Sequence, residues 1–274
     1  MNLEYQKVHS FDGLQLHTFS SAVQDERAKL LLIHGYAEYA ARYHHFVEIL
    51  NEQGISVYTF DLRGHGKSEG LTAYIRKMED VLSDVDRIID HYELANKAFI
   101  MGHSLGGLIA TRYVLSRNQN QFKGLITSAA ALAIDPDLSP FLQKLAPILG
   151  ILFPKLKTEK LDISTLTRSP DILQAYENDP LVYREGTRAR TGAEMLKTVK
   201  QIPGLFSKLE IPLLAMHGSD DRTTMPHGTQ ALYDNAKSAD KKLKIYDGLF
   251  HELVNEPERE VVMKDIYTWL LERA

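Results

Sequence analysis

A serine flanked by glycines follows a short apolar run, and no other residue in the sequence is as well placed to act as a nucleophile. The run from Ala98 to Met101 has the character of a buried strand, and Gly102-His103-Ser104-Leu105-Gly106 follows it. This pentapeptide fits G-x-S-x-G, in which a sharp turn between a strand and a helix holds a serine hydroxyl above the edge of a sheet. The glycines leave room for the turn, since side chains there would collide with the neighbouring strand or helix. The alternative is a glycine-rich turn whose serine only caps the helix.

A serine nucleophile needs a histidine and a carboxylate, and the sequence offers both late in the chain. Because the hydroxyl is a weak nucleophile at neutral pH, a histidine must accept its proton while a carboxylate orients that histidine. In chains with this turn the order is serine, acid, histidine. Asp220 and Asp221 follow one predicted strand and His251 follows the next, whereas His227 is expected to open a surface helix. His251 is therefore the predicted base, and spacing alone leaves Asp220 and Asp221 as alternatives for the acid.

Backbone N–H groups near the serine form the fourth part of such a site. Attack on a carbonyl group develops negative charge on its oxygen, which two N–H donors stabilise. One donor is expected from Leu105, the residue after the serine. The other is expected from Tyr36, in the loop that follows the strand ending in Ile33-His34. The alternative for Tyr36 is an aromatic ring that only lines the pocket, and the two roles are compatible.

Predicted strands and helices, whose ends would position these residues, alternate along most of the chain. Residues 5–9 and 14–19 are expected to pair as an antiparallel hairpin across Asp12-Gly13. The later apolar segments lack polar alternation, as in strands buried on both faces of a parallel sheet. This pattern predicts an α/β fold, a mostly parallel sheet flanked by helices. The expected strands cover residues 29–34, 55–60, 98–101, 124–129, 211–216 and 243–246, and helices cover 78–92 and 258–272.

The alternation stops between residues 134 and 202, where the sequence is largely helical. This predicts a helical cap inserted into a core domain made of residues 1–133 and 203–274. Apolar residues recur at helical spacing in the cap, with lysines around them. One interpretation is a lid helix whose apolar face packs on the pocket mouth, and another is that part of this face stays exposed and docks on lipid surfaces. The apolar set is Phe141, Leu142, Leu145, Leu149, Leu152 and Phe153, and Pro147 is expected to kink or divide the helix.

Composition and charge exclude several other functions. The 274 residues carry a net charge of −4, which offers no basic field for nucleic acid, and the lack of cysteine excludes thiolate catalysis and zinc–thiolate sites. Gly66-Lys67-Ser68 ends like a phosphate-binding loop, but Asp61 stands where its first glycine belongs. No cofactor and no metal are implied. Without a secretion signal or an apolar stretch of about 20 residues, a cytoplasmic location is expected, and the oligomeric state stays open.

Taken together, these residues resemble the α/β-hydrolase superfamily and, within it, the monoacylglycerol lipase and lysophospholipase family. The resemblance covers nearly the whole chain after the first hairpin. Its H-G-x-x-D spacing selects Asp221 over Asp220 as the acid. It implies Ser104, Asp221 and His251 as catalytic residues, with the N–H groups of Tyr36 and Leu105 as the oxyanion hole. The motifs that carry it are His34-Gly35 with Glu38 and Arg42-Tyr43, Asp61 to Gly70, Gly102 to Gly107, His217 to Arg222, and His251-Glu252.

The function that this resemblance implies is a serine ester hydrolase that cleaves monoacylglycerol to fatty acid and glycerol through an acyl-enzyme. A lysophospholipase, thioesterase or carboxylesterase with the same triad is the alternative within enzymes. A non-catalytic lipid-binding protein of the same fold is a further alternative, although such a protein has no need of the whole set of serine, acid and histidine. The expected partner is a single-chain lipid ester, with peripheral membrane contact through the cap.

Overall fold

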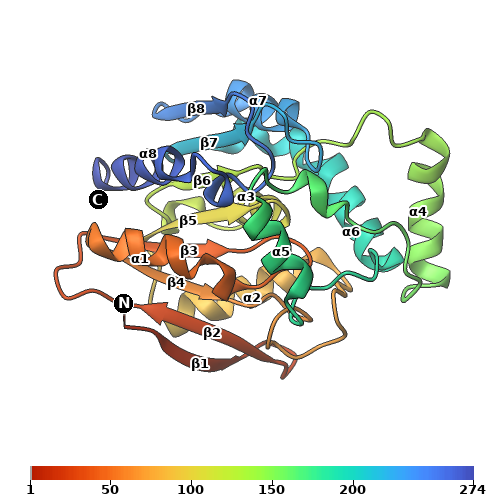
Figure 1. Cartoon of the computed structure of the whole chain (residues 1–274), viewed down its shortest axis with the longest axis horizontal. Helices are drawn as coiled ribbons and strands as arrows, with labels where there is room; N and C mark the ends of the chain where they lie inside the picture. The colour runs from red at the N-terminus through yellow and green to blue at the C-terminus, as the bar shows by residue number, and fades with distance from the viewer. Residues whose placement is uncertain (1) are drawn as a thin grey trace.

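One eight-stranded sheet runs through the computed structural model, which describes residues 2–274 (Figure 1). The strand order is β1-β2-β4-β3-β5-β6-β7-β8. The six strands β3 to β8 are parallel, while β1 and β2 form an antiparallel hairpin that joins β4. The predicted α/β fold with a mostly parallel sheet is confirmed. The strands are β1 (Glu4–His9), β2 (Gln15–Ser21), β3 (Ala28–Ile33), β4 (Ile55–Phe60), β5 (Ala98–His103), β6 (Leu125–Ser128), β7 (Leu213–Gly218) and β8 (Lys241–Tyr246).

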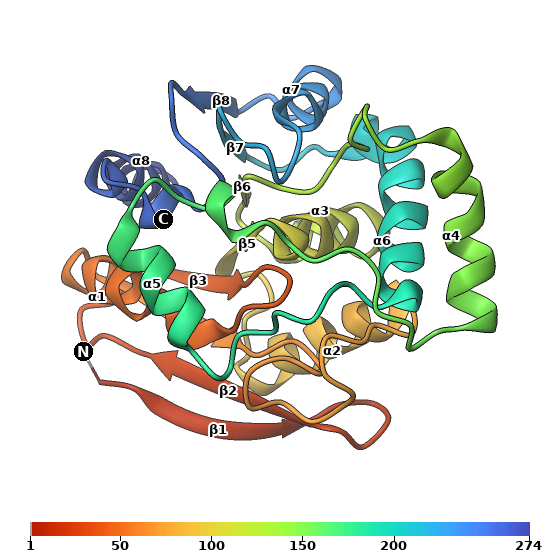
Figure 2. The same cartoon turned by 45° about the vertical axis from the view of Figure 1, so that its right-hand side comes forward.

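Helices cover both faces of the sheet, so that two apolar cores form (Figures 1 and 2). Alternate residues of β3 supply the two cores, because successive side chains of a strand point to opposite faces. Leu30 and Leu32 pack with α1 and α8, whereas Leu31 and Ile33 pack with α2 and α3. The helices are α1 (His44–Glu52), α2 (Met78–His91), α3 (Leu105–Ser116), α4 (Pro140–Leu152), α5 (Pro170–Asn178), α6 (Ala189–Gln201), α7 (Pro226–Asn235) and α8 (Arg259–Leu271). Short 3₁₀ turns cover Ala40–Tyr43, Gln119–Gln121, Ile163–Thr165, Ile202–Lys208 and Leu253–Asn255.

The segment between β6 and β7 holds α4, α5 and α6, and the cavity described below lies between this segment and the loops that follow the strands. In parallel sheets this edge is where ligands bind. The segment is not separate from the core, since Val199 and Ile202 at the end of α6 pack with α2 and α3. The domain boundaries at residues 134 and 202 therefore stay a prediction.

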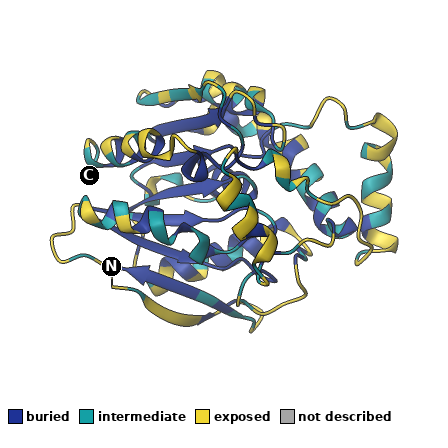
Figure 3. Cartoon of the chain, in the orientation of Figure 1, coloured by how far each residue is buried: buried dark blue, intermediate teal, exposed yellow. Residues whose placement is uncertain are grey.

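Helix α4 stands at the outer side of the cap and packs on α6 (Figures 1 and 3). The contact is close, since a Cβ on Gly150 would lie 2.7 Å from the Cβ of Ala193. Pro147 lies inside the helix and does not divide it. Among the described residues none of α4 lines the cavity. The interpretation that the apolar face of this helix packs on the pocket mouth is therefore wrong, because that face meets α6 on one side and solvent on the other.

Candidate active site

Ser104 lies in a strained turn between β5 and α3. Its φ of 53° and ψ of −117° are rare for a residue with a side chain. The flanking glycines permit this turn: a Cβ on Gly102 would lie 2.1 Å from the Gly106 carbonyl oxygen, and one on Gly106 would lie 2.2 Å from that of Ile33. The Ser104 N–H donates to the carbonyl oxygen of Ser128 at 3.0 Å, which ties the turn to β6. The turn thus brings Ser104 to the wall of a cavity at the edge of the sheet.

His251 and Asp221 form a buried hydrogen-bonded pair, although they come from loops after two different strands. The Nδ1 atom of His251 lies 2.7 Å from Oδ2 of Asp221. Because a carboxylate only accepts, Nδ1 carries the proton and Nε2 keeps its lone pair. This is the tautomer that a general base requires. Thr224 supports the pair, since its hydroxyl lies 2.9 Å from the same carboxylate oxygen and 3.2 Å from Nδ1.

The structure distinguishes the two aspartates that spacing alone left open. Asp221 is buried, and its second oxygen accepts the N–H groups of Thr223 at 2.7 Å and Thr224 at 3.0 Å. Asp220 is exposed, and among residues 2–274 its carboxylate accepts only from the neighbouring hydroxyl of Ser219, at 2.8 Å. The structure therefore brings Asp221, and not Asp220, to His251. His227 lies exposed in the first turn of α7, as expected.

The electrostatics of the pair favour a charged carboxylate and a strengthened base. Burial raises the pKa of Asp221, but the charge of His251 and the hydrogen bonds from His217 and His251 outweigh it and hold that pKa well below its usual value. Burial lowers the pKa of His251, but the Asp221 carboxylate outweighs it, with smaller contributions from Glu252 and Glu38, and raises that pKa above its ordinary value. An imidazole with a raised pKa is a stronger proton acceptor.

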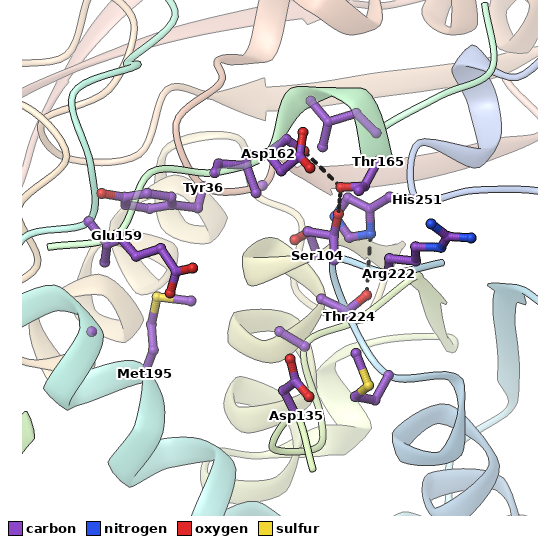
Figure 4. A pocket seen from close by; sticks show the side chains of 18 of the residues that line it. Tyr36, Ser104, Asp135, Glu159, Asp162, Thr165, Met195, Arg222, Thr224 and His251 are labelled. Carbon is purple, nitrogen blue, oxygen red and sulfur yellow. Dashed lines mark hydrogen bonds between the residues drawn. The ribbon is translucent and has the colours of Figure 1, made fainter. Parts of the chain in front are cut away.

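Ser104 and His251 line the same cavity, and Figure 4 shows their side chains together at its centre. Their neighbourhood is tight, since the His103 ring beside Ser104 lies 4.6 Å from the His251 ring, centroid to centroid. Among residues 2–274 the Ser104 hydroxyl and the His251 ring do not share a hydrogen bond. Such bonds are often long in a free enzyme and shorten when substrate binds.

The loop after β3 reaches the turn of Ser104. A Cβ on Gly35 would lie 3.1 Å from the Cβ of Ser104 and 2.8 Å from Oε1 of Glu38, so any side chain there would crowd both residues. Glu38 fixes the loop by accepting the Gly35 N–H at 2.6 Å. The N–H groups of Tyr36 and Leu105 donate to no other described residue. Both are therefore available to an oxygen bound beside Ser104, where the sequence predicts the oxyanion hole.

Comparison with known proteins is consistent with this geometry. The family model described as serine aminopeptidase, S33 matches residues 24–258. A monoacylglycerol lipase of Mycolicibacterium smegmatis is 34% identical over 272 residues, which is 96% of each chain. The chain belongs to the α/β-hydrolase family of these lipases. The family that the sequence resembles is thus confirmed.

Two further members of this α/β-hydrolase family show how far the likeness extends. The crystal structure of a monoacylglycerol lipase from Paleococcus ferrophilus matches the whole of both chains with a TM-score of 0.85 at 31% identity. The phospholipase YtpA of Bacillus subtilis is 32% identical and covers 86% of this chain and 92% of its own. The fold is therefore shared over its full length, cap included.

In this hydrolase a buried charge network links the loop of Tyr36 to the loop of His251. Arg42 donates to Glu38 at 2.7 Å and to both carboxylate oxygens of Glu252 at 2.8 and 2.9 Å. Both glutamates are buried, and the guanidinium also lies 4.7 Å from the ring centre of Tyr176 in α5. Burial raises the pKa of Glu252, but Arg42 outweighs it and lowers that pKa to about 2. Sequence reasoning gave this network no role, although Glu38, Arg42 and Glu252 stand in the motifs that carried the resemblance.

The cavity that Ser104 and His251 line has a volume of about 520 Å³. Met195, Leu196 and Val199 of α6 supply an apolar wall, and Figure 4 places Met195 across the cavity from Ser104. A smaller cavity of about 180 Å³ adjoins it behind Tyr36. Charged side chains of both signs also line the larger cavity: Asp135, Glu159, Lys160, Asp162 and Arg222.

Other histidines near the site do not have the properties of a second base. Burial lowers the pKa of His103, which contacts His251, to about 4. Burial likewise lowers the pKa values of His34 and His65 to about 4, and both rings bond to backbone groups nearby. Their expected structural role is consistent with these contacts. Within residues 2–274 no cluster of side chains is suited to hold a metal ion.

Proposed function

We propose that this chain hydrolyses monoacylglycerols, with Ser104 as nucleophile, His251 as base and Asp221 as the acid that orients it. As a member of its family the chain is a serine ester hydrolase. The observation that carries the proposal is the contact of 2.7 Å between His251 Nδ1 and Asp221 beside a serine held in a strained turn. This arrangement keeps Nε2 of the imidazole free of Asp221, and His251 lines the same cavity as Ser104.

The reaction follows from these positions. Ser104 Oγ forms a bond to the ester carbonyl carbon while its proton passes to His251 Nε2, and the N–H groups of Tyr36 and Leu105 receive the oxyanion. The bond from that carbon to the glycerol oxygen then breaks, and the proton on His251 passes to the leaving alcohol. His251 then takes a proton from water, whose oxygen bonds to the acyl carbon; the bond to Ser104 Oγ breaks as that oxygen receives the proton back from His251, and the fatty acid leaves. Asp221 stays charged throughout and stabilises the imidazolium.

The two cavities support a single-chain lipid with a hydroxylated head. The wall of Met195, Leu196 and Val199 gives an acyl chain apolar contact. The smaller cavity is lined by Tyr36 and Tyr183, whose buried hydroxyls have no hydrogen-bond partner among the described residues. Unpaired buried hydroxyls are costly, so a small shift that turns either one toward the cavity would let a glycerol hydroxyl there satisfy it.

The test is turnover and active-site labelling. A fluorophosphonate probe is expected to label the wild type and Ser116→Ala, an exposed control on α3, while Ser104→Ala loses both labelling and ester hydrolysis. A panel of monoacylglycerols of graded length, set against di- and triacylglycerols, is expected to show turnover of the single-chain esters. A protein that binds these lipids but reacts with neither probe nor ester is the non-catalytic alternative, and that result refutes the proposal.

A lysophospholipase is the second candidate, because the similar protein of Bacillus subtilis is a phospholipase. The charged groups of the cavity favour the neutral glycerol ester, since Asp135, Glu159 and Asp162 outnumber Lys160 and Arg222 and repel a phosphate. Side-by-side kcat/KM values for a monoacylglycerol and a lysophospholipid of equal chain length decide between them. A thioesterase or general carboxylesterase is tested by adding the matching thioester and a short ester to the panel.

We also propose that α4 docks the enzyme reversibly on lipid surfaces in the cytoplasm. No helix within residues 2–274 has the length and apolar character to cross a bilayer. Yet Ile148, Ile151 and Leu152 on the outer face of α4 are 52, 68 and 64% exposed, and Lys144 and Lys155 lie exposed nearby. An apolar face with basic flanks is suited to the surface of an anionic membrane.

Vesicle binding tests this docking. Ile148→Ser, Ile151→Ser and Leu152→Ser together are expected to weaken binding to anionic vesicles while hydrolysis of a short soluble ester stays unchanged. Leu145 and Leu149, which belong to the same apolar set, are half-buried and are less suitable for this test. Vesicle binding that survives the triple substitution refutes docking through α4.

A further inference from the structure

A second histidine, His217, contacts the carboxylate of Asp221. It stands at the end of β7, is fully buried, and has no place in the reaction proposed above. Its Nε2 atom lies 3.0 Å from Oδ2 of Asp221, the same oxygen that contacts Nδ1 of His251 at 2.7 Å. One carboxylate oxygen therefore lies between two imidazole rings.

The neighbours of His217 fix where its proton sits. Nε2 faces two acceptors, the Asp221 carboxylate and the carbonyl oxygen of Thr224 at 3.2 Å, so Nε2 carries hydrogen. Nδ1 lies 2.7 Å from the hydroxyl of Thr229 in α7, which can donate to it. A neutral ring accepts at one nitrogen and donates at the other. A chain of hydrogen bonds thus runs from Thr229 through His217 to Asp221 and on to His251.

We propose that His217 is a positioning residue that acts through Asp221, by holding Oδ2 toward His251 and taking up part of its negative charge. The inference rests on the proposed roles of Asp221 and His251. The other oxygen of Asp221 is held by two backbone N–H groups, which a side-chain substitution leaves in place. On Oδ2, His217 and Thr224 are the only described groups besides His251 that can donate a hydrogen bond. The hydroxyl of Thr224 has one proton and also lies 2.9 Å from the carbonyl oxygen of Ala129. When that proton goes to Ala129, only His217 remains to support the oxygen.

Loss of the hydrogen bond from His217 is expected to change the pH dependence of kcat/KM, which loss of side-chain packing alone would not change. More of the negative charge of Asp221 then faces His251, so the imidazolium becomes harder to deprotonate. The low-pH limb of kcat/KM therefore moves to higher pH. The other charged or titratable groups that act on His251 are Glu252, Glu38 and His103, and none of them contacts His217.

The experiment compares His217→Leu, which removes the donor, with His217→Gln, which restores an N–H donor, in the full-length protein. His227→Leu, an exposed histidine ten positions along, is the matched control. With a short soluble ester, His217→Leu is expected to lower kcat about tenfold, which corresponds to about 1.4 kcal/mol and lies near the lower end of the contribution of one hydrogen bond to a charged group. KM is expected to stay unchanged and the low-pH limb to move upward, while Gln recovers part of both effects and His227→Leu alters neither.

Two results overturn the inference: an unchanged kcat and pH profile in folded His217→Leu, or a fall in kcat with an unmoved pH profile that Gln does not recover. Where His217→Leu does not fold, Thr229→Val takes its place. It weakens the donor by leaving Nδ1 without its partner, so a smaller change in the same direction is expected, and no change refutes the inference. Asp221→Asn separates the two proposals, since full activity of this variant refutes the assignment of Asp221 itself.

Discussion

Removal of Arg42 gives a demanding test of how the site is held together. This guanidinium donates three hydrogen bonds of 2.7 to 2.9 Å to the buried carboxylates of Glu38 and Glu252. Glu38 accepts the Gly35 N–H in the loop of the predicted oxyanion hole, and Glu252 directly follows His251. Arg42→Met keeps most of the apolar stem but leaves both carboxylates buried without their counter-charge.

The expected cost follows from that burial. The side chains of Glu38 and Glu252 are 4 and 5% exposed, and that of Arg42 is 10% exposed. Breaking a buried ion pair by removing one partner costs about 3–5 kcal/mol, because an uncompensated charge stays in the interior. For a chain of this size such a loss corresponds to a fall in Tm of roughly 6–10 °C. The free energy of unfolding is therefore expected to fall several times more in Arg42→Met than in a variant that removes one partner of an exposed ion pair.

The pH dependence of the free energy of unfolding provides an independent test, because its direction differs between the wild type and Arg42→Met. In the wild type Arg42 lowers the pKa of Glu252 from 4.5 to about 2, so its stabilisation is present above pH 4.5 and is lost as the pH falls toward 2. In Arg42→Met only His103 and the hydrogen bond from Asn255 still oppose burial, and we expect burial to outweigh them and raise that pKa above 4.5. The folded variant then binds a proton more tightly than the unfolded chain does, and its stability increases as the pH falls. The stability difference between the two proteins must shrink from neutral pH toward pH 4.5.

Thermal unfolding at neutral pH and at pH 4.5 measures both effects. Lys97→Met is the matched control, because its partner Glu93 is 3.7 Å away and both side chains are largely exposed. Solvent screens such a pair, so little change is expected. The loss of kcat/KM in Arg42→Met is expected to exceed any loss in the control. The reasoning is refuted if Arg42→Met unfolds at the Tm of the control, or if its deficit grows toward low pH.

Three further predictions concern the turn, the base and the cavity. Gly106→Ala is expected to destabilise the fold by about 3 kcal/mol or more, because the new Cβ would lie 2.2 Å from the Ile33 carbonyl oxygen. The control Gly204→Ala, which has open space around it, is expected to leave the Tm unchanged. Thermal unfolding measures both variants. The value of kcat/KM is expected to fall toward low pH with a midpoint above pH 6.5, because the raised pKa of His251 keeps this residue protonated, and unable to accept a proton, up to a higher pH. A midpoint below pH 6.5 contradicts this prediction. Leu196→Trp narrows the apolar wall and is expected to shift the preferred monoacylglycerol toward shorter chains, with labelling by fluorophosphonate unchanged.

The elements of this fold could be predicted from local pattern because each depends on residues close in sequence. The G-x-S-x-G turn forms as expected, and its glycines are required by contacts that a Cβ would violate at 2.1 and 2.2 Å. The continuous apolar segments became the parallel strands, because burial on both faces permits no polar alternation. The order of serine, acid and histidine narrowed the acid to two residues, and the family resemblance then selected Asp221. In the structure Asp221 is buried at 2.7 Å from His251, whereas Asp220 is exposed.

What the sequence left unpredicted depends on contacts between distant residues. Arg42 and Glu252 are 210 positions apart, so no local pattern pairs them. Helical spacing marked α4 as apolar on one face but not which surface covers it, and the structure shows α6 there instead of the pocket mouth. Helical periodicity predicts that a helix has an apolar face, but the tertiary arrangement determines which surface covers that face.

The distinction between local properties and contacts of distant residues also applies to how Ser104 and His251 are held. A nucleophile can be held by its own turn, because φ, ψ and the neighbouring glycines are local properties. The base has no such turn: His251 is positioned by Asp221 on one side and, through Glu252, by Arg42 on the other. Its orientation therefore depends on buried charges contributed by three separate loops. Substitutions of these charged partners should alter the pH profile and the stability together, whereas substitutions of the glycines should act on stability first.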